Sequence, residues 1–207
     1  MTTAIASKTQ GATLLSHTQQ ASATVTIGST VDVSSAFSAH VFIHMGRTVA
    51  TALSNQVRFR LEGSAKSSNN DQWYPLIEWT SSDGTTTASS STVNDASFNS
   101  ADTTFVITSA TGIAAGDKLY LRETGTPANS EWVRVSAVSG TTITLEEGVT
   151  RGHTNGINVA DTAESWNWDV DINAVGRIRL VVDTASATSG QTVDVEAFVT
   201  TLDSINS

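Results

Sequence analysis

Apolar and polar residues alternate at every second position in several segments, as in half-buried β-strands. In residues 56–62, apolar side chains alternate with Arg58, Arg60 and Glu62. One face of such a strand packs into a core and the other meets solvent. The same alternation recurs in residues 165–172, 176–183 and 192–199. No convincing amphipathic helix longer than two turns is found, so the pattern predicts an all-β protein.

Two other segments predict strands with special positions in a sheet. Residues 39–45 are the most continuously apolar run, which is typical of a strand covered on both faces. Residues 72–79 also predict a strand, but Pro75 has no N–H to donate. We therefore expect this strand to lie at a sheet edge or to contain a bulge. Residues 23–27 and 31–33 predict a hairpin.

The stretch from residue 104 to 151 predicts a separate small unit. Its short runs, rich in β-branched and aromatic residues, are separated by turn-forming residues, and Ser139-Gly140-Thr141 is the expected tight turn of the last hairpin. We expect an antiparallel meander or small barrel inserted into a larger domain. The expected strands are 104–108, 117–123, 131–138 and 142–147.

Polar segments surround this unit. Residues 80–101 and 151–164 consist largely of Ser, Thr, Asn, Asp and Gly, and we expect them to be linkers because they offer little apolar surface. Residues 1–20 predict an N-terminal arm that orders against a partner, or else a first edge strand. The predicted domains are the arm, 1–20; an outer sandwich, 21–83 and 165–207; and an inserted β-module, 84–164.

The outer domain is expected to hold about eight strands, the size of a jelly-roll-like antiparallel β-sandwich. Late strands must pair with early ones, because each half alone would leave an apolar face open. Opposite charges on neighbouring strands favour pairing. We therefore expect Asp194 and Glu196 to lie across from Arg58 and Arg60.

Composition excludes several classes of function. The chain has no cysteine, so it has neither disulfides nor thiolate metal sites. Its net charge of -9 argues against a nucleic-acid partner, which would require concentrated Lys and Arg. No apolar run is long enough to cross a bilayer, and the N-terminal residues lack the pattern of a secretory signal. We expect a protein made in a cytoplasm, with no membrane partner.

The sequence contains no recognisable catalytic or cofactor signature. There is no Gly-x-Ser-x-Gly elbow and no phosphate-binding Gly-Lys-Ser/Thr loop, and no carboxylate pair stands out for glycoside hydrolysis. None of the four histidines has a triad context; they are His17, His40, His44 and His153. We expect no enzymatic activity and no cofactor.

Metal binding is also not expected. On a strand, His40 and His44 would lie roughly 13 Å apart, too far to share an ion. The run from Asp169 to Asn173 resembles the start of a calcium loop, but Ala174 and Leu180 stand where such a loop needs Gly and Glu. These acidic and amide side chains are better interpreted as the solvated face of a strand.

Four tryptophans are spaced in pairs. The even spacing of Trp73 and Trp79 predicts that both lie on one strand face, and the same holds for Trp166 and Trp168. Exposed rings would form a platform for a sugar or a protein partner, whereas buried rings would belong to the sandwich core. Burial is the commoner fate of large aromatic side chains.

The segments 39–48, 71–79, 176–183 and 193–199, with 116–123 and 131–135 in the inserted unit, resemble a known class. Together they are similar to structural proteins of tailed-bacteriophage virions, most closely capsid decoration or cement proteins. The resemblance implies a non-enzymatic virion protein that bridges neighbouring subunits of the major capsid protein, commonly as a homotrimer. The alternative is a tail or fibre-associated module that recognises a host-surface glycan through Trp73, Trp79, Trp166 or Trp168.

Overall fold

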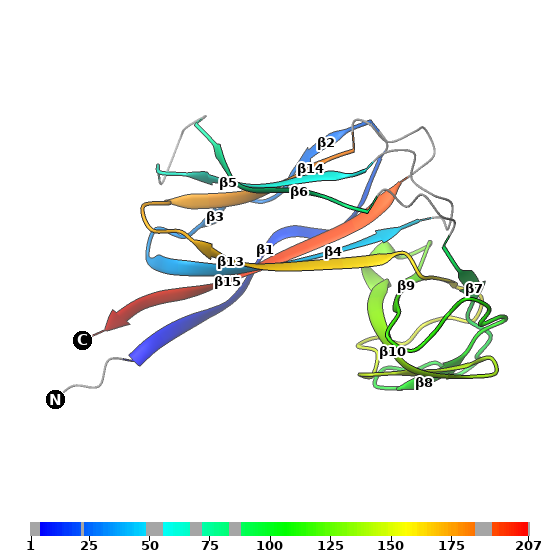
Figure 1. Cartoon of the computed structure of the whole chain (residues 1–207). Helices are drawn as coiled ribbons and strands as arrows, with labels where there is room; N and C mark the ends of the chain where they lie inside the picture. The colour runs from blue at the N-terminus through cyan, green and yellow to red at the C-terminus, as the bar shows by residue number, and fades with distance from the viewer. Residues whose placement is uncertain are drawn as a thin grey trace.

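The computed structural model describes residues 5–21, 23–48, 56–66, 72–82, 88–184 and 192–206. The regular elements in this part of the chain are β-strands, apart from one short 3-10 turn, η1 (Pro127–Asn129), and the prediction of an all-β protein is confirmed (Figure 1). No helix among the described residues is long and apolar enough to cross a membrane. The strands are β1 (Ile5–Gln20), β2 (Val25–Ile27), β3 (Val31–Asp32), β4 (Ala36–Arg47), β5 (Arg58–Ser64), β6 (Tyr74–Thr80), β7 (Ser90–Thr92), β8 (Thr104–Val106), β9 (Lys118–Arg122), β10 (Glu131–Ser139), β11 (Thr142–Leu145), β12 (Asn158–Ala160), β13 (Ala163–Asp171), β14 (Arg177–Asp183) and β15 (Val193–Asn206).

Two antiparallel sheets stack to form the larger part of the molecule (Figure 1). The first has the strand order β1-β15-β4-β13, and the second has the order β2-β14-β5-β6 with β3 beside β14. Strands from both ends of the chain therefore interleave in each sheet. Two facing sheets of this kind form a jelly roll, which confirms the predicted jelly-roll-like sandwich.

The jelly-roll core follows the alternation in the sequence. In β5, Phe59 and Leu61 are buried between the sheets, while Arg58 is exposed. Ile43 from β4 and Val195 from β15, both in the first sheet, belong to the same core. Full burial of each such side chain contributes about 1.5–3 kcal/mol, so interleaving strands from the two ends of the chain stabilises the whole sandwich.

Residues 5–20 are the long edge strand β1, paired with β15, which is the second of the two alternatives expected for this segment. The first alternative, an N-terminal arm over 1–20 that orders only against a partner, is wrong for the described residues. The physical reason is the apolar pair Leu14 and Leu15, which is buried in the jelly-roll core of the same chain.

Strand β6 confirms the expectation for Pro75. It lies at the edge of its sheet and also contains a bulge. Ile77 pairs with Leu61 and Pro75 pairs with Glu62, so Leu76 is one extra residue on the β6 side. A bulge of this kind changes which face the residues on either side of it present.

The inserted unit is a six-stranded barrel with the order β7-β12-β9-β10-β11-β8. A bridge between Val93 and Ile107 joins the two end strands, and the N–H of Thr108 donates to the carbonyl of Thr92 at 2.9 Å. The four strands expected between residues 104 and 147 correspond to β8, β9, β10 and β11. The barrel strands lie within residues 90–160, inside the predicted insertion, whose first boundary at 83/84 lies outside the described residues.

The prediction that residues 80–101 and 151–164 are linkers is wrong for much of their described length. They contribute β7 and β12, and Phe98 is buried in the barrel core, stacked on Phe105 with ring centroids 4.5 Å apart. A polar segment with only a few apolar residues becomes ordered here, because the closing barrel supplies hydrogen-bond partners for its backbone polar groups.

The expected pairing of Asp194 and Glu196 with Arg58 and Arg60 is also wrong. Asp194 and Glu196 lie on β15, and Arg58 and Arg60 lie on β5, in the other sheet. Arg58 instead forms an ion pair with Glu78. Charge complementarity alone did not identify the partner strand, because core packing places β15 beside β4.

We predict that Phe98→Ala lowers the free energy of unfolding by about 3–5 kcal/mol, because it leaves a cavity in the barrel core. Chemical denaturation measures this change. Phe37→Ala is the matched control, since Phe37 is 47% exposed, and it is expected to be close to neutral. Equal stability of the two variants would mean that the segment around Phe98 does not pack as described.

Candidate functional site

Three of the four singled-out tryptophans lie together over the jelly-roll core. Trp79 stacks on Phe59 with ring centroids 5.3 Å apart and lies 4.3 Å from Trp168. Trp166 lies 5.2 Å from Phe59. All three are partly buried and pack against the core between the sheets.

Trp73 lies on the opposite face of its sheet, although even spacing predicted the same face as Trp79. Its ring stacks under the guanidinium groups of Arg179 at 4.1 Å and Arg177 at 5.2 Å. The bulge at Leu76 is the reason, because it reverses the alternation between the two tryptophans. The four rings therefore form no common platform, and their contact with a glycan or a partner stays a prediction.

The feature that joins the two parts of the molecule is Tyr120 on β9. Its neighbours Leu119 and Leu121 point into the barrel core, so Tyr120 points outward, onto the first jelly-roll sheet. There its ring lies over Gly46 of β4, where an added Cβ would come within 2.5 Å of the ring. The ring also stacks on Trp132 of β10 at 5.1 Å. Only glycine at position 46 leaves room for this approach.

A set of polar groups surrounds the Tyr120 hydroxyl, which we call the junction contact: Tyr120, Asp194, Arg122 and His17. The hydroxyl donates to Oδ2 of Asp194 at 2.5 Å, and Nε of Arg122 donates to the same oxygen at 3.3 Å. Nε2 of His17 lies 3.1 Å from the hydroxyl oxygen. Because the single hydroxyl proton goes to Asp194, His17 donates from Nε2.

The junction contact is almost fully buried. Asp194 and Tyr120 are each 1% exposed. Burial, followed by the negative charge of Asp194 and the hydrogen bond to it, raises the pKa of the Tyr120 hydroxyl well above its ordinary value. A buried carboxylate with such donors is stable only while they are present, so the contact determines how the barrel sits on the sheet.

Two histidines flank Trp132 in the same junction. The His17 ring lies 4.8 Å from Trp132, and the His44 ring lies 5.5 Å from it. Burial lowers the pKa of His17 and, with the charge of Lys118, that of His44. Burial raises the pKa of Glu196, whose carboxylate lies 3.8 Å from Nδ1 of His17.

A second buried polar group holds the barrel loops. The side chain of His153 is buried between Glu123, 3.6 Å from Nδ1, and Glu131, 3.5 Å from Nε2. Burial raises the pKa of Glu131, but the nearby His153 ring and the hydrogen bonds donated by the backbone N–H groups of Thr150 and Arg151 outweigh burial and lower it. The arrangement ties the 150–153 segment to β9 and β10.

His40 lies on β4 of the first jelly-roll sheet, outside the junction, and its Nδ1 contacts Asp169 of β13 at 2.5 Å. Asn167, Asp169 and Asp171 are exposed, as expected for the solvated face of a strand. No group of three or more His, Asp or Glu side chains among the described residues is arranged to hold a metal ion.

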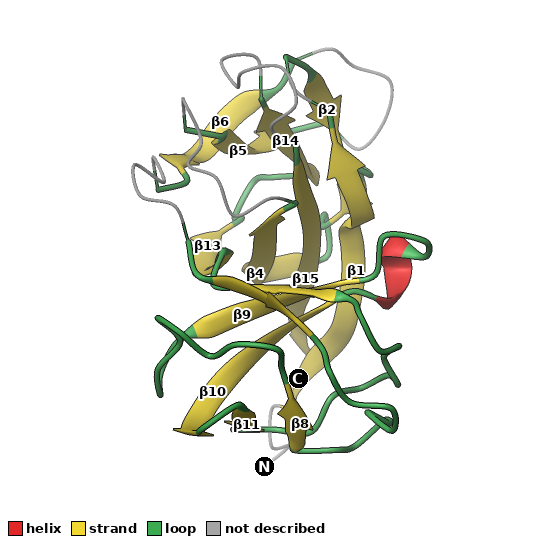
Figure 2. Ribbon diagram, turned by 90° about the vertical axis from the view of Figure 1, so that its right-hand side faces the viewer, coloured by secondary structure: helices red, strands yellow, loops and turns green. Residues whose placement is uncertain are grey.

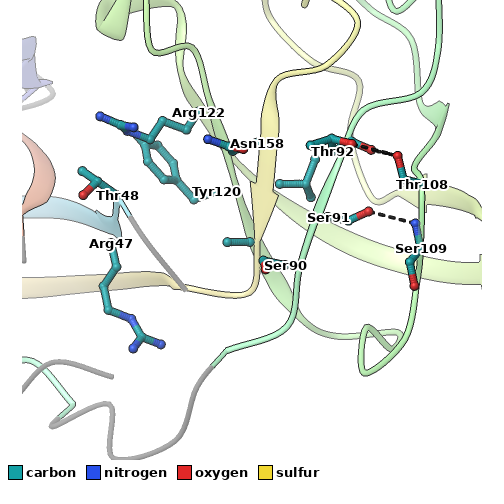
Figure 3. A pocket seen from close by; sticks show the side chains of 12 residues that line it. Arg47, Thr48, Ser90, Ser91, Thr92, Thr108, Ser109, Tyr120, Arg122 and Asn158 are labelled. Carbon is teal, nitrogen blue, oxygen red and sulfur yellow. Dashed lines mark hydrogen bonds between the residues drawn. The ribbon is translucent and has the colours of Figure 1, made fainter. Parts of the chain in front are cut away.

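A cavity of about 470 Å³ opens beside the junction contact, and we call it the junction cavity (Figure 3). Arg47 and Thr48 at the end of β4 line its jelly-roll side. Strands β7, β9 and β12 line its barrel side. The barrel-side residues are Ser90, Ser91, Thr92, Thr108, Ser109, Tyr120, Arg122, Asn158, Val159 and Ala160.

The sequence pattern predicted neither the junction contact nor the junction cavity. One signal was present, because Lys118, Tyr120 and Arg122 alternate with leucines in a way that marks a second, outward face on β9. Asp194 gave no such signal, since its partners are distant in sequence and lie in the other part of the molecule.

No family model and no curated protein matches the chain. Among solved structures, it is similar to the SPBc2 prophage-derived protein YomS, with 11% identity over 97% of this chain and 99% of that chain, at a TM-score of 0.32. The chain is also similar to VP17, a capsid protein of bacteriophage P23-77, with 13% identity over 97% of this chain and 100% of that chain, at a TM-score of 0.21. The third similar structure is that of infectious bursal disease virus Gx strain, with 13% identity over 96% of this chain and 41% of that chain, at a TM-score of 0.26. All three are phage or viral proteins, but scores this low carry no argument about function.

We predict that Tyr120→Phe lowers the free energy of unfolding by about 2–3 kcal/mol, because buried Asp194 loses its hydroxyl donor. Denaturant titration measures the change. Tyr74→Phe is the matched control, since Tyr74 is 62% exposed, and we expect no change there. A neutral Tyr120→Phe would show that Asp194 does not depend on this bond.

Protonation of the junction histidines should weaken the fold. Because the pKa values of His17 and His44 are lowered from 6.5, the unfolded chain binds protons more readily, and stability falls as the pH drops below that value. We expect this loss to begin near the unfolded histidine pKa of about 6.5 and to continue at lower pH. The raised pKa of Glu196 acts in the opposite direction and offsets part of the loss as that carboxylate protonates. The double variant His17→Gln, His44→Gln should lose less stability over the same interval, and an unchanged pH dependence would contradict the assignment.

Proposed function

We propose that the chain is a non-enzymatic structural protein of a phage virion that decorates the capsid shell and stabilises it by bridging neighbouring major-capsid-protein subunits. The observation that carries this proposal is the junction contact. A bridging protein must hold two surfaces at a set angle, and here the jelly roll and the barrel are joined through buried groups that favour one orientation.

The buried ionisable groups support a structural role. Asp194 is engaged by Tyr120 and Arg122, and His153 lies between Glu123 and Glu131. Each of these groups therefore connects one element of the fold to another. Catalytic groups, by contrast, are held where a substrate reaches them.

The shape of the jelly roll suits contact with other subunits. Strands β1 and β15 form a long antiparallel ribbon that carries both chain ends away from the barrel (Figure 1). The edge strand β1 is 16 residues long, and a partner can pair with an edge of this kind by strand addition. Figure 2 shows η1 of the barrel beside this strand, so one end of the edge is next to the inserted unit.

Charge is consistent with the outside of a shell. The net charge of -9 disfavours contact with packaged nucleic acid. We propose a homotrimer as the assembling unit and the virion as its location, with the chain made in the host cytoplasm.

Purified phage particles provide the test, with copies of this chain counted per major shell subunit by quantitative mass spectrometry. We expect one copy for each shell subunit or for every few. A handful of copies per particle would instead favour the tail or fibre-associated glycan-binding alternative, and complete absence would exclude a virion role.

Heat disruption of undecorated shells tests the bridging itself. Added full chain should raise the disruption temperature. Tyr120→Phe should raise it less, because its barrel is held less firmly, while Tyr74→Phe should act like the unmodified chain. Bound protein that leaves the disruption temperature unchanged would contradict stabilisation by bridging.

A further inference from the structure

The junction cavity lies where ligand sites are common, at the boundary between two packed units. Its volume of about 470 Å³ is within the range of small-molecule sites, about 300–1,000 Å³. Figure 3 shows Arg47 and Thr48 on one side and Ser90, Asn158 and Thr92 on the other. The two sides belong to the jelly roll and the barrel respectively.

The floor of the cavity is a flat piece of barrel sheet. Thr92, Asn158 and Arg122 are direct neighbours across β7, β12 and β9. Because Val159 and Leu121 point into the barrel core, this row points outward. Neighbouring strands are about 4.8 Å apart, so the row spans roughly 10 Å, which matches the length of one or two sugar rings.

A second row lies beside the first, and it forms the hollow. It contains Ser90, Ala160 and Tyr120, again in register across the three strands. Alanine in the middle leaves space above the sheet. The hydroxyl of Ser90 lies on one side of it and the ring of Tyr120, whose hydroxyl is engaged by Asp194, lies on the other. A polar floor with a small central residue favours a ligand that carries many hydroxyl groups.

The charge of the cavity differs from that of the chain. The chain has 20 acidic and 11 basic residues, yet two arginines and no carboxylate are among the described residues that line this cavity. Carboxylates lie behind the arginines. Asp194 accepts a hydrogen bond from Nε of Arg122. Burial lowers the pKa of Arg47, and the negative charges of Glu164 and Asp161 act in the opposite direction. A guanidinium carries five N–H donors, so the bond from Nε engages one of the five in Arg122.

From this geometry we propose that the junction cavity binds an anionic carbohydrate, a sugar that carries a carboxylate. Arg122 pairs with the carboxylate through donors other than Nε, because a guanidinium has a forked set of donors suited to a carboxylate. Figure 3 shows the Arg47 side chain pointing in another direction, so Arg47 adds positive charge on the jelly-roll side of the cavity. The hydroxyl and amide groups of Thr92, Asn158 and Ser90 bond to the sugar hydroxyls. This inference goes beyond the proposed virion role and does not depend on it.

Isothermal titration calorimetry of the full chain with sodium glucuronate tests the proposal. We expect saturable binding, with glucose and inorganic phosphate each weaker by on the order of tenfold, because each lacks one half of the recognised chemistry. Equal binding of glucose would overturn the role of the arginines. Stronger binding of phosphate would reduce the site to a simple anion site, and no binding of glucuronate would leave a solvent-filled crevice.

Two substitutions in the cavity locate the binding. Asn158→Trp fills the floor at an exposed position, and Arg47→Gln removes one cation. Both should weaken glucuronate binding by on the order of tenfold or more. Arg58→Gln removes the same charge on the other sheet, where the side chain is 57% exposed, and should leave binding unchanged.

The outcomes separate cleanly from folding and from the virion role. Because Arg47 is buried, the binding result for Arg47→Gln counts only if the unfolding transition of this variant matches that of the parent. If it does not, Asn158→Trp alone tests the location of the site. Undiminished binding in Asn158→Trp would place the sugar elsewhere and overturn the assignment. The number of copies per virion is measured independently, so failure of either proposal leaves the other standing.

Discussion

The hydrogen bond from the Tyr120 hydroxyl to buried Asp194 is the contact on which the arrangement of this molecule depends. It joins a barrel strand to β15, an inner strand of the first jelly-roll sheet. A buried carboxylate without donors is strongly unfavourable, so barrel and sheet stabilise each other through this one oxygen. Gly46 is the steric counterpart, because the ring reaches Asp194 only where β4 has no side chain in its path.

This contact also explains why the molecule has a cavity beside the junction. The barrel leaves the jelly roll after β6 and returns at β13, so it is attached at one end of the sandwich. Tyr120 and Arg122 hold it there through one face of β9, and the neighbouring strands β12 and β7 continue that face away from the sheet. The space between this face and the end of β4 is the junction cavity. Tyr120 and Arg122 therefore belong to both features, which couples any ligand in the cavity to the orientation of the barrel.

The chain is acidic, and several of its few arginines make contacts within the fold. Arg177 and Arg179 stack on Trp73 on the outer face of the second sheet, and Arg179 is also paired with Glu62 at 2.7 Å. Nε of Arg122 contacts Asp194. Each of these guanidinium groups contacts an aromatic ring or a carboxylate in the fold. A protein whose surface charge is mostly negative can in this way keep local positive sites without attracting nucleic acid over its whole surface.

Local alternation by itself determined which segments become strands, because a pleated strand alternates its faces whatever it pairs with. The strands at 56–62, 165–172 and 176–183 followed from it. Two other local signals also held: β-branched and aromatic runs between turn residues predicted the four barrel strands between 104 and 147, and the missing N–H of Pro75 predicted its edge position. Tertiary structure decided what alternation does not encode. One bulge at Leu76 moved Trp73 to the other face, barrel closure turned the polar segment around Phe98 into core, and packing set β15 beside β1 and β4. The junction contact and its cavity belong to this second class, since their residues meet only when two distant parts of the chain have folded and packed.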